Sequence, residues 1–105
     1  MPVRYVSKKQ FDTFGPPRVD ETISEEVEWF ADEEGVVIGI ITREKANSNY
    51  SIAILGRDQH GTFRAFDTDT GLETVNTARR QLFVKMERAL TTGAKVFPRR
   101  ATGDA

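Results

Sequence analysis

The sequence predicts an α+β fold: a four-stranded antiparallel β-meander with a long C-terminal helix packed on one face and a short N-terminal helical segment. Between residues 26 and 67, short apolar runs alternate with turn-rich stretches, which is typical of antiparallel strands. From residue 74 to 90 the apolar spacing changes to the period of a helix. The chain has 105 residues, 38% of them hydrophobic, which suits one modest core. We therefore expect a single domain over residues 1–92 and a flexible tail over residues 93–105.

A short helix is expected over residues 7–14. Ser7 is its predicted N-cap, because a serine hydroxyl can accept a hydrogen bond from a free N–H group of the first turn. The run Gly15-Pro16-Pro17 ends this helix, since proline cannot continue a helix and restricts the residue before it.

Four strands are predicted, over residues 26–32, 36–43, 50–56 and 62–67. In the first, Val27, Trp29 and Ala31 alternate and should share one face, with Trp29 in the core. A buried indole N–H needs a hydrogen-bond acceptor, so we expect a polar partner for Trp29.

The strand over residues 36–43 is apolar on both sides, so both faces of the sheet need a cover. One helix covers one face only. We expect the opposite face to carry Phe30, Val37, Ile41 and Phe66, with Leu55 or Tyr50. Either the N-terminal segment covers this face, through Tyr5, Phe11 and Phe14, or a second subunit does. The second alternative predicts a homodimer.

The helix over residues 74–90 should pack through its apolar stripe, with Leu82 and Met86 at the centre. Residues 70–73, Thr-Gly-Leu-Glu, match a capping box, so the acidic stretch before them is expected to be a strand-to-helix junction. Gly93 fits the position that follows a helix end.

The stretch "LGRDQHGTFRAF" holds the only histidine of the chain, His60. Asp58 suits the start of a type I turn and Gly61 the left-handed position that follows it, so a turn explains both. His60 then lies at an exposed loop tip, a poor place for a general base. Arg57 and Arg64 are expected to lie across this hairpin and to pair with Asp58 or Asp67.

Catalytic chemistry has little support elsewhere in the sequence. The chain contains no cysteine, which excludes disulfides, thiolate zinc sites and cysteine nucleophiles. We predict no catalytic residue, no cofactor and no metal ligand. With no signal-peptide pattern and no apolar run long enough to span a bilayer, we expect a cytoplasmic protein with no membrane partner.

Charge is distributed unevenly, although the net charge is only −1. Residues 19–42 hold eight acidic residues and no Lys or Arg, whereas residues 79–100 hold seven basic residues and one acid. These segments form two solvated faces or, alternatively, complementary surfaces for association. The candidate contacts to a nucleic acid or a protein partner are Arg79, Arg80, Arg88, Lys95, Arg99 and Arg100.

Two resemblances bear on function. The stretch from "EWFADEEG" to "FRAFDTD", with Trp29, Gly35, Gly39 and Gly61, resembles a small bacterial family without an assigned function. That resemblance implies a fold and no catalytic residues. The order helix, Gly-Pro-Pro, strands, helix is similar to the double-stranded-RNA-binding domain, which implies RNA binding.

The second resemblance departs from its family in charge. That family holds phosphates with a basic cluster at the start of its last helix, where "TVNTARRQ" offers only Arg79 and Arg80. The first predicted strand is strongly acidic and would repel phosphate.

The sequence therefore favours a non-enzymatic binding or regulatory module that acts through a sheet face or a dimer interface. A protein partner is favoured over a nucleic acid. The first alternative is binding of RNA or another nucleic acid through the basic C-terminal helix and tail. The second is an enzyme with an unrecognised carboxylate site.

Overall fold

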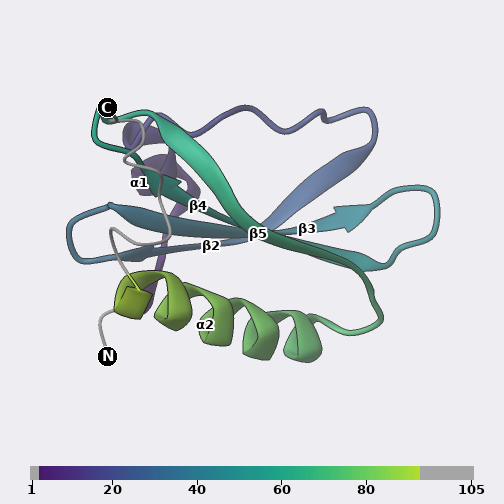
Figure 1. Ribbon diagram of the computed structural model, residues 1–105. Coiled ribbons are helices and arrows are strands. Elements are labelled where there is room, and N and C mark those ends of the chain that lie inside the picture. Colours follow the sequence, from purple (N-terminus) through teal and green to yellow (C-terminus); the bar gives the residue numbers. More distant parts are fainter. Residues whose placement is uncertain (1–2, 93–105) are drawn as a thin grey trace.

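The computed structural model describes residues 3–92 as one five-stranded antiparallel sheet with two helices. The elements are β1 (Val3–Val6), α1 (Lys8–Thr13), β2 (Ser24–Asp32), β3 (Val37–Glu44), β4 (Tyr50–Arg57), β5 (Phe63–Leu72) and α2 (Val75–Thr92). The strand order is β1-β2-β3-β4-β5. Figure 1 shows α2 along one face of the sheet, and α1 with the loop that follows it on the other. The α+β class, the antiparallel sheet and the long C-terminal helix are thus confirmed.

The prediction of four strands was wrong, because β1 adds a fifth. Its register with β2 runs from Val3 opposite Asp32 to Val6 opposite Trp29. Both valines are buried, one on each face of the sheet. A strand of four residues is too short for alternation to stand out in the sequence. Its partner β2 supplies the pairing that makes it a strand.

The helix α2 docks through Leu82 and Met86, as predicted, and both side chains are 0% exposed. Gly39 of β3 lies directly beneath them. A Cβ atom at this position would lie 2.7 Å from Met86 Sδ and 3.1 Å from Leu82 Cδ1. The missing side chain at residue 39 therefore allows the helix to approach the sheet closely. The buried residues of this core are Val3, Phe30, Val37, Ile41, Ile52, Ile54, Ala78, Leu82, Met86 and Ala89.

Most of the apolar residues that we expected on the face opposite the helix lie on the other face of the sheet, so this prediction was wrong. Phe30, Val37, Ile41, Phe66 and Tyr50 do share a face, but it is the face that α2 covers. Of the residues named for the opposite face, only Leu55 lies there. The sequence offers two comparable apolar faces, and the space above Gly39 decides which one accepts the helix.

A β-bulge between Glu26 and Glu28 explains a second error in β2. The bulge breaks the alternation, so that Val27 packs on the α2 side while Trp29 and Ala31 pack on the α1 side. The predicted common face for these three residues was therefore wrong. The indole Nε1 of Trp29 donates a hydrogen bond to Glu26 Oε1 at 2.7 Å, as expected for a partly buried tryptophan.

The N-terminal segment covers the second face of the sheet. Ser7 caps α1 as predicted, because its Oγ accepts a hydrogen bond from the Gln10 amide at 3.0 Å. Phe11 is 3% exposed and packs in a core with Ala31, Ile38 and Ile40. Phe14 and Val19 pack against the same core.

Tyr5 does not take part in that cover, contrary to the prediction. Its ring lies on the α2 side of the sheet, with its centroid 4.6 Å from that of Phe30. It is 53% exposed.

The predicted capping box was also wrong, because β5 continues to Leu72. Thr74 caps α2 instead, since its Oγ1 accepts a hydrogen bond from the Thr77 amide at 3.1 Å. Gly71 has a φ of +71°, and it lies at a register shift between β4 and β5, where Leu72 pairs with Tyr50 and Asp69 with Ile52. Gly93 and the predicted tail lie outside the described residues.

Two backbone amides of the edge strand β5 donate hydrogen bonds to aspartate side chains of the same strand. Asp67 Oδ1 accepts from the Thr68 amide at 2.8 Å, and Asp69 Oδ1 accepts from the Thr70 amide at 2.9 Å. These bonds occupy backbone donors that an edge strand could otherwise offer to another strand. Neither helix in residues 3–92 is long and apolar enough to cross a membrane.

Candidate functional site

The segment around His60 is a turn, as predicted. Asp58 Oδ1 accepts hydrogen bonds from the amides of His60, at 2.8 Å, and Thr62, at 3.1 Å. Asp58 Oδ2 accepts from Arg64 Nε at 2.9 Å, and this bond lowers the pKa of Asp58 to about 2. Gly61 has a φ of +80°, and the His60 side chain is exposed. Asp58 and Gly61 therefore hold the turn, and His60 only occupies its tip.

Arg57 joins three loops on the α1 side of the molecule. Its guanidinium donates to the carbonyl oxygens of Phe14 at 2.7 Å, Gly61 at 2.9 Å and Gly35 at 3.2 Å. It also lies over the Phe63 ring, 4.2 Å from the centroid. The expected pairing of Arg57 with an aspartate was wrong, whereas that of Arg64 was right.

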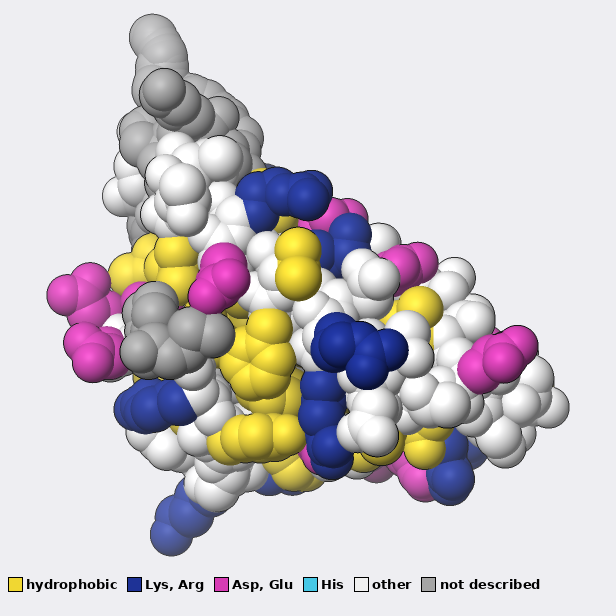
Figure 2. Space-filling view, turned by 90° about the horizontal axis from the view of Figure 1, so that it is seen from below, with side chains coloured by type: hydrophobic (Ala, Val, Ile, Leu, Met, Phe, Trp, Pro, Cys, Tyr) yellow, Lys and Arg dark blue, Asp and Glu magenta, His cyan; other side chains and the backbone are white. Residues whose placement is uncertain are grey.

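Two of the basic residues predicted for partner contacts lie exposed on the outer surface of α2, where the charge of Arg88 helps to lower the pKa of Asp67. Arg80 and Arg88 are exposed, and their side chains make no hydrogen bond or ion pair within residues 3–92. Figure 2 looks onto this surface and shows hydrophobic groups near its centre with Lys and Arg groups beside them.

Arg79, another of the predicted contacts, is already paired within the protein, unlike Arg80 and Arg88. Arg79 Nε donates to Glu28 Oε1 at 2.8 Å, and this pairing raises the pKa of Arg79. Arg79 therefore fastens α2 to β2 and is not free for a partner. Lys85 pairs in the same way with Asp67 of β5, at 2.8 Å, which lowers the pKa of Asp67. The predicted contacts Lys95, Arg99 and Arg100 lie outside the described residues.

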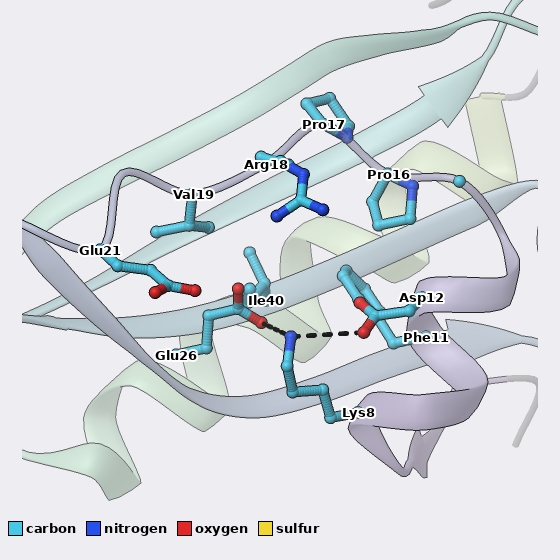
Figure 3. Close-up of a pocket in the computed structure, with 11 residues that line it drawn as sticks. Lys8, Phe11, Asp12, Pro16, Pro17, Arg18, Val19, Glu21, Glu26 and Ile40 are labelled. Carbon is cyan, nitrogen blue, oxygen red and sulfur yellow. Dashed lines mark hydrogen bonds and ion pairs between the residues drawn. The ribbon is translucent and has the colours of Figure 1, made fainter.

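A hollow of about 220 Å³ lies on the opposite side of the molecule, between α1, β2 and the loop over residues 15–21. We call it the α1-face groove. Its floor is apolar and consists of Phe11, Val19 and Ile40. The charged side chains on its walls are Lys8, Asp12, Arg18, Glu21 and Glu26 (Figure 3).

Glu26 organises one wall of the α1-face groove. Its Oε1 accepts hydrogen bonds from Lys8 Nζ at 3.1 Å and from Trp29 Nε1 at 2.7 Å. Lys8 Nζ lies 3.4 Å from Asp12 Oδ2 as well. The hydrogen bond to Glu26 is the largest cause of the raised pKa of Lys8. Lys8 is thus held as a cation between two carboxylates, and its charge is already neutralised.

Arg18 and Glu21 differ from Lys8 because neither side chain is paired. No hydrogen bond or ion pair of the Arg18 guanidinium or the Glu21 carboxylate is found within residues 3–92. Figure 3 shows both groups turned toward the same hollow. Counting partners within residues 3–92 only, the groove therefore presents one free cation and one free anion above its floor.

The loop that carries these two groups is held at several points. Pro16 and Pro17 restrict its backbone at one end. At the other, Asp20 Oδ1 accepts from the Thr22 amide at 3.0 Å, and Lys45 Nζ donates to the Glu21 carbonyl oxygen at 2.6 Å. The backbone that carries the two charged side chains is therefore a fixed loop.

A second hollow, of about 300 Å³, adjoins the α1-face groove. The two share Lys8, Glu21 and Glu26 in their walls. The second hollow adds Ser24, Glu25, Trp29 and Lys45. Its presence leaves room for a ligand that extends beyond the groove.

The sequence prediction missed every charged residue of the α1-face groove. The only available signal was the position of Arg18 directly after Gly15-Pro16-Pro17, in a stiff loop between a helix and a strand. No group of three or more His, Asp or Glu side chains in residues 3–92 is placed to hold a metal ion.

Comparisons with protein families, with curated proteins and with solved structures gave no match to this chain. Function must therefore be argued from the site itself.

Proposed function

We propose that this protein is a non-enzymatic binding module that takes a small charged ligand in the α1-face groove. The observation that carries the proposal is the Arg18 guanidinium, which faces the groove without a partner in residues 3–92. Binding sites typically combine an apolar lining with a few convergent polar groups that orient the ligand. Phe11, Val19 and Ile40 supply the first of these features, and Arg18 and Glu21 supply the second.

The fixed loop supports the same proposal. A site whose groups are already in position loses less conformational freedom on binding, so more of the contact energy appears as affinity. The bonds of Asp20 and Lys45 hold the loop in the absence of a ligand.

Titration of the protein with small fragments, followed by amide chemical shifts, tests the proposal. We expect 3-methylbutylamine or 4-methylpentanoate to shift amides around Phe11, Val19 and Ile40. Arg18→Gln should weaken binding of the carboxylate fragment. Arg4→Gln, which removes an exposed arginine that does not line the groove, is the matched control and should leave fragment binding unchanged. If neither these fragments nor a ligand that carries both charges shifts the groove amides, the proposal is wrong.

We propose secondly that two copies associate, with the outer surface of α2 in one copy against the turn between β2 and β3 in the other. Val84 is 53% exposed at the middle of that surface, and Arg80 and Arg88 lie one helical turn away on either side of it. The exposed Glu33 and Glu34 of another copy would complement these two arginines.

Sedimentation equilibrium at several concentrations, in low and high salt, tests this association. We expect a dimer that weakens in high salt and is lost in Val84→Asp. A monomeric mass throughout would contradict it. Binding of Arg80 and Arg88 to duplex RNA, measured by fluorescence anisotropy, would favour the nucleic-acid alternative instead. A bacterial source, a cytoplasmic location and the lack of catalytic activity stay predictions of the sequence.

A further inference from the structure

We infer that the ligand of the α1-face groove is a small zwitterion that carries an apolar side group, of which an α-amino acid such as leucine is the simplest example. This inference rests on the proposed binding function and specifies the chemistry of the ligand. It follows from the arrangement of charges, from the floor and from the size of the groove.

The groove has two charged poles that do not neutralise each other. Arg18 and Glu21 face the same hollow from one loop, yet no ion pair joins them. An ammonium group of a ligand can bind Glu21 while a carboxylate of the same ligand binds Arg18. A ligand that carries both charges satisfies both poles at once.

Glu26 strengthens the anionic pole. Its Oε1 already accepts from Lys8 and Trp29, whereas its Oε2 accepts no hydrogen bond within residues 3–92. A ligand ammonium near Glu21 therefore has a second carboxylate oxygen within the same hollow. Among residues 3–92, Arg18 is the cation of the groove that is left to bind the carboxylate of the ligand.

The charge balance of the groove disfavours other ligands. Three carboxylates, those of Asp12, Glu21 and Glu26, face two cations, Lys8 and Arg18, which leaves a formal charge of −1. A phosphate or another multiply charged anion would meet repulsion from this excess. A simple amine would be attracted, but it would leave Arg18 without a partner. A zwitterion adds no net charge and pairs with each pole.

The floor and the volume define the rest of the ligand. Phe11 and Ile40 lie at the floor but are only 3% and 5% exposed, and the more exposed apolar side chains of the lining are Val19, Pro16 and Pro17. A cavity of about 150 Å³ can hold benzene, so the groove, at about 220 Å³, suits a compact aliphatic group. The side chain of leucine or isoleucine meets this requirement.

Three matched fragments test the inference by amide chemical-shift titration. Leucine carries both charges, 4-methylpentanoate lacks the amine, and 3-methylbutylamine lacks the carboxylate. We expect leucine to bind at least about tenfold more tightly than either of the others, which corresponds to about 1.4 kcal/mol.

Two variants identify the poles. Arg18→Gln should weaken binding of leucine and of the acid but leave that of the amine unchanged. Glu21→Gln should weaken binding of leucine and of the amine but leave that of the acid unchanged. Both residues are exposed, so the fold should tolerate both changes, and the amide spectrum of each free variant verifies this.

The outcomes separate this inference from the proposed function. If leucine binds no better than one of the single-charge fragments, the zwitterion is ruled out while the groove remains a binding site. If none of the three fragments shifts the groove amides, both proposals are wrong. The inference would be established if leucine bound most tightly, Arg18→Gln weakened only leucine and the acid, and Glu21→Gln weakened only leucine and the amine.

Discussion

Arg57 Nη2 lies 2.7 Å from the carbonyl oxygen of Phe14, across 43 residues of sequence. This hydrogen bond joins the end of α1 to the end of β4. The same guanidinium reaches the carbonyl oxygens of Gly35 and Gly61, so that one side chain fixes the end of the helix and two hairpin turns. The α1 cover of the sheet, and with it the α1-face groove, depends on this attachment.

Replacement of Arg57 by Met should destabilise the protein by about 1–3 kcal/mol, because partly buried carbonyl groups lose their donors. Arg57→Lys should recover only part of this loss, since an ammonium cannot reproduce the planar fork of a guanidinium. Urea denaturation measures both changes. Arg43→Met is the control: Arg43 makes one ion pair, with Glu25, in which both side chains are exposed, and its loss should cost less than about 1 kcal/mol. Equal effects at the two positions would contradict the role of Arg57.

Replacement of Leu82 by Ala should destabilise the protein by about 2–5 kcal/mol, because Leu82 is fully buried between α2 and the sheet. A denaturation midpoint that does not change would show that the helix does not dock there.

Replacement of Gly39 by Ala should cost about 1–3 kcal/mol, because the new methyl group collides with Met86 Sδ. The cost should be smaller in a Met86→Ala background, where the sulfur is absent. A double-mutant cycle of denaturation free energies measures this coupling. Additive effects of the two substitutions would mean that Met86 does not lie over Gly39.

Asp58 should make stability depend on pH in the acid range. Its hydrogen bond with Arg64 is the main reason that its pKa falls from 3.8 to about 2 in the folded protein. Because the folded pKa is the lower one, the stabilisation is fully present above pH 3.8. It is lost as the pH falls toward 2. The difference in unfolding free energy between the native protein and Asp58→Asn should therefore shrink over that interval.

Urea titrations between pH 7 and pH 2 measure this difference. Glu33→Gln serves as the control, since Glu33 is an exposed carboxylate in another turn. A difference that stays constant down to pH 2 would show that the Asp58 carboxylate is not responsible.

His60→Ala should leave the stability of the fold unchanged, because the exposed imidazole holds no part of the turn. Gly61→Val should cost about 1–3 kcal/mol, since a β-branched residue is strained at a φ of +80°. Thermal unfolding of the two variants compares them directly. If Gly61→Val left the stability unchanged while His60→Ala lowered it, the turn would depend on the histidine and not on the glycine.

Much of the fold was predictable because it depends on local patterns. The helical spacing around Leu82 and Met86, the Ser7 cap and the turn at Asp58 and Gly61 are each encoded within a few neighbouring residues. β1 and the side of the sheet that α2 covers were not predictable in this way. Both depend on partners that are distant in the sequence: β2 in the first case and the space above Gly39 in the second.

The candidate site was harder to predict than the fold. Lys8, Arg18 and Glu26 come from a helix, a loop and a strand, and only the tertiary structure brings them together. In the sequence they are ordinary surface charges. Glu26 in particular belongs to an acidic stretch that suggests a solvated edge. The β-bulge that follows this residue could not be foreseen from alternation alone.

The order of strands in the sheet has a kinetic consequence. Each strand pairs with its neighbour along the chain, and the hairpins from β2 to β5 are closed by short connections. The entropy lost in closing such loops is small, and proteins rich in local contacts reach their transition state quickly. We therefore expect the hairpins around β3 to form early in refolding. The helix α2 would then complete the core late, so that Leu82→Ala would accelerate unfolding more than it slows folding.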